Sequence, residues 1–363
     1  MDKQERWPFI SIIIVNYNGS MYLAECLSSV LKSYYPSFEV ILIDNASTDD
    51  SVPIVKELFK DQIIVVCNSS NLGFAEGNNV GARYARGDYL VFLNNDTKVD
   101  MLWLRELVKV MESDPKIGAA QAKLLMLNSV GVIDSTGDFV DFYVTTMQRG
   151  LGERDVGQYE NIEEVFSARG ACMIVRRDVI KEVGLFDPDF YLSLEDIDLC
   201  WRIRLHGYKI MYVPKSVVYH KGFGTPSIVR EYHGGKNSFS LMIKNYDSYN
   251  LISYLFLNTF MFLGAFTLDI FIRRSREFTV RKLSIVRWLF FNLPSLMKKR
   301  RNVQSLIRKV PDKDLKKIML RSNLALYTRY MLELHRALEN AENYKKVTRW
   351  YFSITEPTRR CKK

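Results

Sequence analysis

Short apolar runs alternate with helical segments between residues 9 and 97, and this alternation limits the fold more than any other feature of the chain. We expect strands over 9–15, 38–43, 63–66 and 89–93. We expect helices over 21–31, from a cap at 47–50 to residue 59, and over 73–86, the last closed by Gly87. Strands that alternate with helices at this spacing form right-handed βαβ units and a parallel sheet. The sequence therefore predicts an α/β fold.

Polar residues follow each of these four strands, namely Asn16, Asp44, Asn71 and Asp96. The carboxyl ends of parallel strands lie at one edge of a sheet, which is where open α/β sheets bind ligands. One polar strand end is an ordinary turn, whereas four that converge favour a nucleotide-sized site. No G-x-G-x-x-G follows the first strand and no Walker A motif occurs, so we exclude an NAD enzyme and a P-loop ATPase.

The fourth strand runs directly into Asn94-Asn95-Asp96-Thr97. A carboxylate at this point is a hard oxygen ligand suited to Mg²⁺ or Mn²⁺, which takes one or two protein carboxylates together with phosphate oxygens. The same residue types also form turns that cap a following helix. The segment alone leaves a metal ligand and a turn as alternatives for Asp96.

A second acidic segment begins at Ser193 and continues through Glu195, Asp196 and Asp198 to Arg202. Its pattern is that of a capping box followed by acids in the first helical turn, where the helix dipole stabilises them, and this is a complete structural explanation. Asp198 and Arg202 are also spaced to form an ion pair four residues apart. That pair leaves Glu195 and Asp196 at the helix start, where a carboxylate can act as a general base.

His220 ends a strand expected over 216–220. A single histidine there is either a structural residue or a second metal ligand, since imidazole joins carboxylates at mixed Mn²⁺ sites.

Five segments resemble the signature blocks of family 2 glycosyltransferases, and they resemble the rhamnosyltransferase-like branch most closely. They are IIIVNYN at 12–18, DNASTDDS at 44–51, NLGFAEGNNVG at 71–81, LNNDT at 93–97 and EDIDLCWR at 195–202. The resemblance extends from about residue 9 to residue 246. It implies a GT-A fold, with a mostly parallel sheet flanked by helices, and inverting transfer of a sugar from a UDP- or dTDP-linked donor.

The resemblance also implies roles for individual residues. Asp44 matches the residue that reads the base or ribose, and Asn94-Asn95-Asp96 matches the metal-binding DxD motif for Mg²⁺ or Mn²⁺. Asp196 matches the catalytic base with Glu195 beside it, and His220 matches an additional metal ligand. The donor-pocket positions are matched by Asn16, Asn71, Gly73 and Asn78. Many relatives carry an acid where this chain has Asn94, so we expect weaker metal binding.

The last third of the chain differs in charge and apolar content. Residues 273–309 hold twelve basic residues and one acid, and the net charge of +10 therefore arises in this block, which argues against a nucleic-acid partner. Just before it, 248–268 is uncharged and as a helix is about 31 Å long, enough to cross a bilayer. A buried core helix is the alternative.

A simple crossing conflicts with the basic block, because basic flanks stay in the cytoplasm and the sugar site would then lie outside, away from its donor. A helix that re-enters or lies in the membrane plane avoids this conflict. The apolar stretch 284–297, interrupted by Arg287 and broken by Pro294, is expected to lie in an anionic interface, although a solvated basic helix has the same pattern. An amphipathic helix or helix pair is expected over 312–341.

We therefore expect a catalytic domain over 1–246 and a helical, basic, membrane-associating region over 247–363. The five scattered cysteines without a CxxC motif suggest a reducing compartment, and no secretory signal opens the chain. Together with the apolar helix and the basic block, they lead us to expect the chain at the cytoplasmic face of a membrane. The expected acceptor is a lipid-linked or other glycan. The alternatives are transfer to polyprenyl phosphate or protein, and a catalytically silent membrane scaffold.

Overall fold

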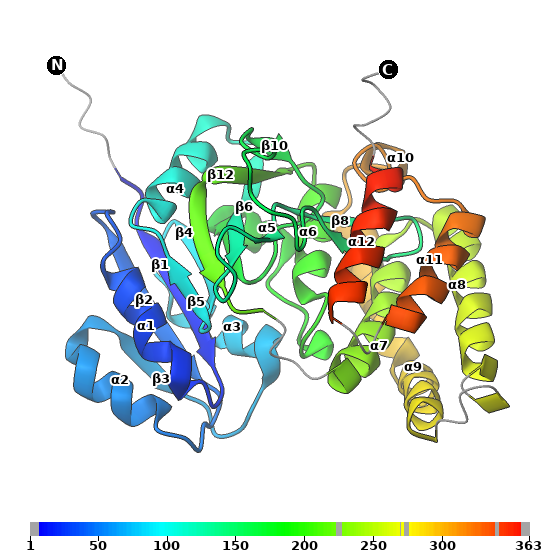
Figure 1. Ribbon diagram of the computed structural model, residues 1–363, viewed down its shortest axis with the longest axis horizontal. Coiled ribbons are helices and arrows are strands. Elements are labelled where there is room, and N and C mark those ends of the chain that lie inside the picture. The colour runs from blue at the N-terminus through cyan, green and yellow to red at the C-terminus, as the bar shows by residue number, and fades with distance from the viewer. Residues whose placement is uncertain (1–6, 223–226, 269, 272–275, 338–340, 357–363) are drawn as a thin grey trace. The chain divides into compact units, whose positions relative to one another are not determined.

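The computed structural model describes residues 7–222, 227–268, 270–271, 276–337 and 341–356. The chain forms two compact units, drawn together in Figure 1. The first comprises residues 1–138, 150–203 and 208–224, and the second comprises 139–149, 204–207 and 225–363. The second unit thus takes in the segment 225–246 as well as the residues expected to form the C-terminal region.

The first unit is organised around one sheet with the strand order β10-β12-β6-β11-β4-β1-β2-β3, to which β5 adds beside β12 and β7 beside β6. The strands β1 to β4 pair in parallel, as predicted, whereas β11 is antiparallel to both β4 and β6, so the second half is mixed. The bounds are β1 Ile10–Asn16, β2 Phe38–Asp44, β3 Ile64–Cys67, β4 Tyr89–Asn94, β5 Thr97–Val99, β6 Ile117–Met126, β7 Ile133–Ser135, β10 Glu163–Glu164, β11 Cys172–Arg176 and β12 Lys209–His220.

Helices cover both faces of this sheet because successive residues of each strand point to opposite sides. Ile10, Ile12 and Ile14 of β1 belong to a core that also contains apolar residues of α1, α2 and α4. On the other face α3 packs on β1, and a Cβ at Gly81 of α3 would collide with the side chain of Ile13. The helix bounds are α1 Ser20–Leu31, α2 Ser51–Phe59, α3 Gly73–Tyr84, α4 Trp103–Ser113, α5 Arg177–Val183 and α6 Glu195–Leu205.

Two predicted helix ends were wrong in detail. The helix α2 begins only at Ser51, and Asp50 at its N-cap makes no side-chain capping bond. Asp49 instead accepts hydrogen bonds from the backbone N–H groups of Ser51 (3.1 Å) and Ser20 (2.9 Å), so this acid joins two loops. The helix α3 ends at Tyr84 with an extended Ala85 as its C-cap, before Gly87 is reached.

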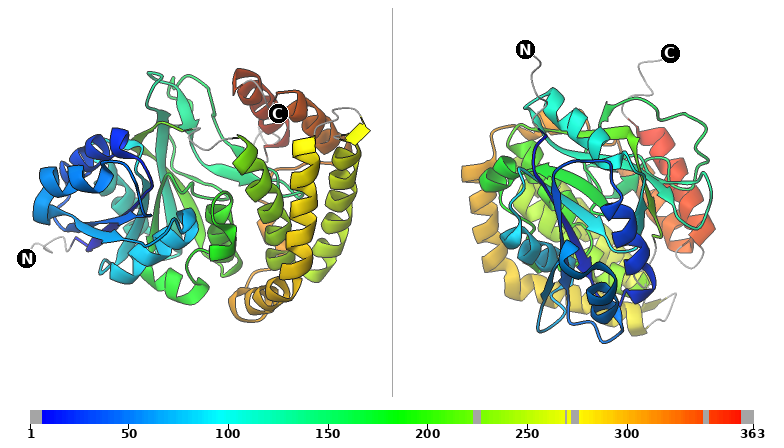
Figure 2. Two further views of the ribbon diagram at one scale, coloured as in Figure 1. Left: turned by 90° about the horizontal axis from the view of Figure 1, so that it is seen from below. Right: turned by 90° about the vertical axis from the view of Figure 1, so that its left-hand side faces the viewer.

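The second unit is mainly helical, with the short strands β8 Asp138–Val140 and β9 Thr146–Gln148. Both α8 and α9 pack against α7, and Figure 2 shows the three helices with their axes roughly aligned. The uncharged segment forms one helix, α8, with the predicted bounds. By contrast, Pro294 lies inside a continuous α9, so the predicted break there was wrong. The bounds are α7 Ser227–Asn245, α8 Ser248–Leu268, α9 Arg276–Asn302, α10 Asp312–Leu315, α11 Leu324–Ala337 and α12 Ala341–Thr355.

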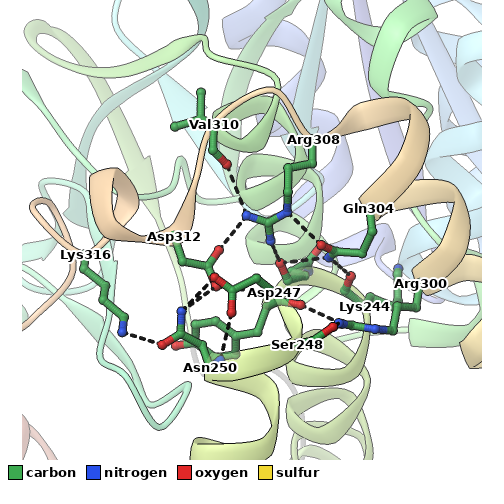
Figure 3. Close-up of polar contacts among 12 residues, drawn as sticks. Lys244, Asp247, Ser248, Asn250, Arg300, Gln304, Arg308, Val310, Asp312 and Lys316 are labelled. Carbon is green, nitrogen blue, oxygen red and sulfur yellow. Dashed lines mark hydrogen bonds and ion pairs between the residues drawn. The ribbon is translucent and has the colours of Figure 1, made fainter.

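A buried polar cluster connects several of these helices (Figure 3). The Asp312 carboxylate accepts hydrogen bonds from Arg308 (2.7 Å), from the N–H of Asp247 (2.9 Å) and from the Asn250 amide (3.0 Å). Arg300 of α9 donates to backbone carbonyls at the end of α7, including that of Tyr246 at 2.6 Å. Because each charge has several partners, the cluster fixes the start of α8 against α7 and α10.

Candidate active site

The strand register brings the predicted polar residues to one edge of the sheet. Asn16 of β1 lies opposite Asp44 of β2, and its neighbour Val15 lies opposite Asn94 of β4. The convergence of the strand ends, predicted from the alternating pattern, is therefore confirmed.

The buried side chain of Asn16 connects three of these strand ends. Its amide nitrogen donates to Asp44 Oδ1 (3.0 Å) and to Ser47 Oγ (3.1 Å). Its amide oxygen accepts a hydrogen bond from Asn95 Nδ2 at 2.7 Å. The second oxygen of Asp44 accepts the N–H of Ser47 at 2.9 Å. This network holds the ends of β1, β2 and β4 in one arrangement without any ligand.

The segment after β3 shapes the start of α3. The Asn71 side chain accepts the N–H of Gly73 at 2.9 Å, and Gly73 has a φ of +77°, which favours glycine. The carbonyl of Tyr191 accepts the N–H groups of Phe74 (2.7 Å) and Ala75 (3.1 Å). A Cβ at Gly73 would lie 2.6 Å from that carbonyl oxygen. The loop around Tyr191 therefore caps α3, an arrangement that residue types alone do not indicate.

Asn78, a predicted donor-pocket residue, is buried in α3, and its amide donates to the carbonyl of Phe74 at 2.9 Å. Its neighbour Asn79 donates to the carbonyl of Phe186 at 2.9 Å. Both amides thus stabilise the scaffold around α3. A contact between Asn78 and a sugar donor stays a prediction.

His220 and Asp96, the two predicted metal ligands, face each other. His220 Nε2 lies 3.4 Å from Asp96 Oδ1 and 3.2 Å from Asn94 Nδ2. The other ring nitrogen, Nδ1, lies 2.8 Å from Oδ2 of Asp134. Burial alone would lower the pKa of the imidazole, but the hydrogen bonds and charges of the two aspartates raise it to about 9.

The chemistry of this pair fits a divalent cation held jointly with a diphosphate. Among the residues that the structure describes, no three His, Cys, Asp or Glu side chains cluster as a complete metal cage. Mg²⁺ commonly keeps only one or two protein ligands and completes its shell with phosphate oxygens and water. Asp96 and His220 would supply those ligands once the proton between them is displaced. Asp134, which sequence reasoning missed, lies in the three-residue strand β7.

The predicted acidic helix is α6, which begins at Glu195. The carbonyl of Leu194 accepts the N–H of Asp198 at 3.0 Å. Ser193 and Leu194 both have positive φ, 67° and 68°, in a region that side chains other than glycine disfavour. The predicted pair of Asp198 and Arg202 is confirmed at 3.0 Å. It leaves Glu195 and Asp196 at the helix start, after a strained turn.

These two adjacent acids have different partners. Asp196 Oδ2 accepts the N–H of Gly170 at 2.9 Å, and its Oδ1 accepts the N–H of Ile197 at 2.8 Å. Glu195 Oε2 is buried without a hydrogen-bond partner among the described residues. Burial raises the pKa of both carboxyls, and the charge of Asp196 raises the pKa of Glu195 further. Hydrogen bonds favour the ionised form of Asp196, whereas Glu195 Oε2 receives none among the described residues, so Asp196 is the more readily ionised acid of the pair.

A further buried carboxyl, Asp138, lies near this pair. Burial raises its pKa to about 7, and the charge of Asp196 contributes to that rise. Asp138 accepts a hydrogen bond from Ser135 Oγ at 2.7 Å. Asp138, Glu195 and Asp196 are thus three acidic groups in a poorly solvated environment, the kind of setting in which a carboxylate can accept a proton near neutral pH.

Comparison with known proteins agrees with these features. Residues 11–184 match the model of glycosyl transferase family 2. The chain is 28% identical over 220 residues to the O-antigen biosynthesis protein RfbC of Myxococcus xanthus, across 59% of this chain and 17% of that protein. It is 26% identical over 211 residues to the poly-beta-1,6-N-acetyl-D-glucosamine synthase of Staphylococcus epidermidis, across 57% of this chain and 48% of that protein. The chain thus spans less than half the length of either relative.

Solved structures resemble the fold at low sequence identity. GalNAc-T7, solved with UDP, GalNAc and Mn²⁺, matches 68% of this chain and 49% of its own, with a TM-score of 0.55 and 21% identity. Residues 1–349 of S. aureus TarS match 95% of this chain and 91% of that one, with a TM-score of 0.51 and 17% identity. The predicted GT-A fold is confirmed, and residues 11–184 match the glycosyl transferase family 2 model.

Proposed function

We propose that the protein is an inverting glycosyltransferase that moves a sugar from a UDP- or dTDP-linked donor to a lipid-linked or other glycan acceptor. The observation that carries this proposal is the Asp196 carboxylate, which two backbone N–H groups hold at the start of α6. Burial raises the pKa of Glu195 beside it, so Asp196 is the more available base. Its raised pKa suits a group that must accept a proton from a sugar hydroxyl.

The reaction is a single displacement. Asp196 accepts the proton of the acceptor hydroxyl as that oxygen bonds to the anomeric carbon from the face opposite the leaving group. The bond between the anomeric carbon and the diphosphate oxygen breaks with its electron pair, and the nucleoside diphosphate departs. Mg²⁺ or Mn²⁺ held by Asp96 and His220 would neutralise the diphosphate as it leaves. Inversion follows from one attack, and no covalent enzyme intermediate is needed.

Asp44, with Asn16 and Asn95 behind it, supplies the acceptor groups for the base or ribose of the donor. GalNAc-T7 was solved with UDP and GalNAc, and residues 1–349 of S. aureus TarS were solved with UDP-GlcNAc. These two similar structures support a nucleotide-linked donor. The rhamnosyl or hexosyl identity of the transferred sugar rests on the resemblance of the signature segments. An acceptor such as polyprenyl phosphate or a protein uses the same chemistry and remains the nearest alternative.

A donor panel tests the proposal directly. Purified protein is incubated without acceptor with UDP- and dTDP-sugars, with and without Mn²⁺, and the released nucleotide is measured. We expect slow, Mn²⁺-stimulated hydrolysis of at least one donor, and NMR of the fresh product should show the inverted anomer. Absence of binding and hydrolysis for every donor would support the silent scaffold instead.

We also propose that residues 247–363 hold the enzyme at the cytoplasmic face of a membrane, with α8 lying in the interface. This helix is long and apolar enough to cross a bilayer. One of its sides, however, packs on protein: Asn258 donates to the carbonyl of Tyr143 at 2.8 Å, and Phe262 packs edge-on against Phe239. The opposite side exposes Phe256 (73%) and Phe260 (68%). A helix with one packed side fits an interface better than a simple crossing.

The helix α9 has the matching composition for an anionic interface. Its outer residues include exposed apolar side chains, with Phe290 at 75%, and exposed basic side chains at Arg287, Lys298 and Arg301. Apolar residues that enter the headgroup layer and cations that meet anionic lipids bind such surfaces together. We define the membrane face as the exposed residues of α8 and α9.

Flotation with vesicles tests the membrane face on the full chain. We expect binding to vesicles that contain anionic lipid and weak binding to neutral vesicles, with further loss at high salt. Phe256→Glu combined with Phe290→Glu should abolish flotation. Val130→Glu, at an exposed apolar residue of the first unit, is the matched control and should float normally. Equal flotation of all three proteins would contradict the assignment.

A further inference from the structure

Asp134 lies outside every sequence segment that indicated the site, yet it contacts one of the two candidate metal ligands. Its side chain is 1% exposed, and its Oδ2 lies 2.8 Å from Nδ1 of His220, which is 5% exposed. Strand β6 lies between β7 and β12, because Leu125 pairs with Ile133 of β7 and with Tyr219 of β12. The sheet itself therefore brings Asp134 to the imidazole of His220.

The two nitrogens of His220 meet different groups as a result. An ionised carboxylate only accepts hydrogen bonds, so Asp134 requires a proton on Nδ1. In the neutral ring the lone pair then lies on Nε2, which faces Oδ1 of Asp96 at 3.4 Å. The amide nitrogen of Asn94 lies 3.2 Å from the same Nε2. Both the tautomer and the ring orientation thus follow from Asp134.

We propose that Asp134 is a positioning residue that fixes His220 with Nε2 directed at the cation shared with Asp96. The inference rests on the proposed function, in which Asp96 and His220 hold Mg²⁺ or Mn²⁺. A carboxylate that accepts the second N–H of a ligating histidine orients the ring and increases its basicity as a ligand. Asp134 thereby strengthens a ligand set that lacks an acid at position 94.

The substitution Asp134→Asn keeps the shape of the side chain and removes its charge, and its amide N–H can instead donate to Nδ1. The ring would then carry its proton on Nε2, in the place of the cation. Asp134→Ala removes the contact altogether. We expect each change to weaken Mn²⁺ binding by roughly 10–100-fold. Free Mn²⁺ measured by electron paramagnetic resonance, in the presence of UDP, gives the affinity without any turnover assay.

A double-mutant cycle distinguishes positioning from a structural effect. In a His220→Ala background, Asp134→Asn should cause no further loss of Mn²⁺ affinity, because it acts only through the ring. Asp141→Asn is the matched control, since this buried carboxyl accepts a hydrogen bond from the Tyr351 hydroxyl at 2.6 Å and belongs to neither site, and it should keep normal Mn²⁺ affinity. Thermal unfolding of each variant checks that the fold is retained.

Three outcomes would overturn the inference. If His220→Ala weakens Mn²⁺ binding but both Asp134 variants do not, His220 is a ligand that needs no positioning, and the proposed function stands. If Asp134→Asn costs the same affinity with and without His220, Asp134 acts by another route. If Asp96→Ala and His220→Ala both leave Mn²⁺ affinity unchanged, the metal part of the proposed function fails, and the role of Asp134 fails with it.

Discussion

The proposed donor end and the proposed base end of the site are constructed in opposite ways. At the donor end, Asn16 makes three side-chain hydrogen bonds that tie β1, β2 and β4 together. At the base end, Glu195 Oε2 has no hydrogen-bond partner among the described residues, and Ser193 and Leu194 adopt a disfavoured backbone conformation. Hydrogen bonds therefore hold the donor end, whereas the base end combines an unpaired carboxylate oxygen with a strained backbone turn among the described residues.

The difference reflects what each end must do. Groups that bind a nucleotide need fixed positions, and a hydrogen-bonded amide network supplies them at little cost in stability. A general base needs a pKa closer to neutral, and burial beside other acids supplies that by disfavouring the ionised form. The following changes should break or sharpen this contrast, in order of decreasing effect.

Removal of the base should affect only the chemical step. We expect Asp196→Asn to lower turnover by about 10²–10⁴-fold, because general-base catalysis typically contributes that much. Nucleotide affinity and melting temperature should change little, since Asn keeps the size and one acceptor. Glu195→Gln is the matched variant and should retain most activity. An inactive Glu195→Gln with an active Asp196→Asn would move the base by one residue.

Removal of the carboxylate at the end of β4 should affect donor binding. Loss of a residue that only supports a metal ligand typically lowers metal affinity by roughly 10–100-fold. Because Asp96 is a proposed direct ligand, we expect Asp96→Ala to weaken Mn²⁺-dependent binding of UDP by at least that factor. The fold should be retained because Asp96 lies at the strand end. Calorimetric titration with UDP, with and without Mn²⁺, measures the effect. Equal affinities for mutant and wild type would make Asp96 a turn residue.

Removal of the amide network should affect stability as well as binding. Asn16→Ala removes the amide that donates to Asp44 Oδ1 and the acceptor of the Asn95 amide, whereas Asp44 Oδ2 keeps the N–H of Ser47. We expect a loss of about 1–3 kcal/mol in the free energy of unfolding, together with weaker nucleotide binding. Chemical denaturation and calorimetry follow the two effects. Ser47→Ala, which removes only a hydroxyl from the same network, should cost less; a larger loss there would show that Asn16 is not the organising residue.

The buried carboxyl of Asp138 should make stability depend on pH. Its pKa is about 7 in the folded protein against an ordinary value of 3.8, so the folded state holds a proton that the unfolded state has lost. Its contribution is therefore complete below about pH 4 and falls as pH rises toward 7, by at most about 1.4 kcal/mol per pH unit. Asp138→Asn should flatten this slope in denaturation curves measured from pH 4 to 8. An unchanged slope would show that a group other than Asp138 binds this proton in the folded state.

The alternating apolar runs and their polar ends predicted β1 to β4, the edge where they converge and the pair of Asp198 and Arg202. These features depend on local periodicity and spacing, which can be read directly from the order of residue types. Asp134 escaped notice because a three-residue strand has no readable period. The cap on α3 was not predicted because the backbone carbonyl of Tyr191 supplies it. Every residue has a backbone carbonyl, so the residue types do not indicate which one caps the helix.

Tertiary contacts also explain the misjudged helix in the second unit. Proline usually ends a helix because it lacks an N–H and its ring collides with the preceding turn. Beyond Pro294, however, Leu296 is fully buried, and Arg300 donates to the carbonyls of Ile243 and Tyr246. Those contacts stabilise the last turns of α9, which remain helical beyond the proline.

The carbonyl of Tyr191 has a consequence for anyone who wishes to exchange parts of this enzyme with those of a relative. Phe74 and Ala75 at the head of α3 depend on that carbonyl, and the same loop leads within four residues to Glu195. A transplant of the segment 71–81 alone would leave those N–H groups facing a foreign loop. We therefore expect the start of α3 and the turn before α6 to be exchangeable only as one module, so that a successful chimera carries residues 71–81 and 184–196 together.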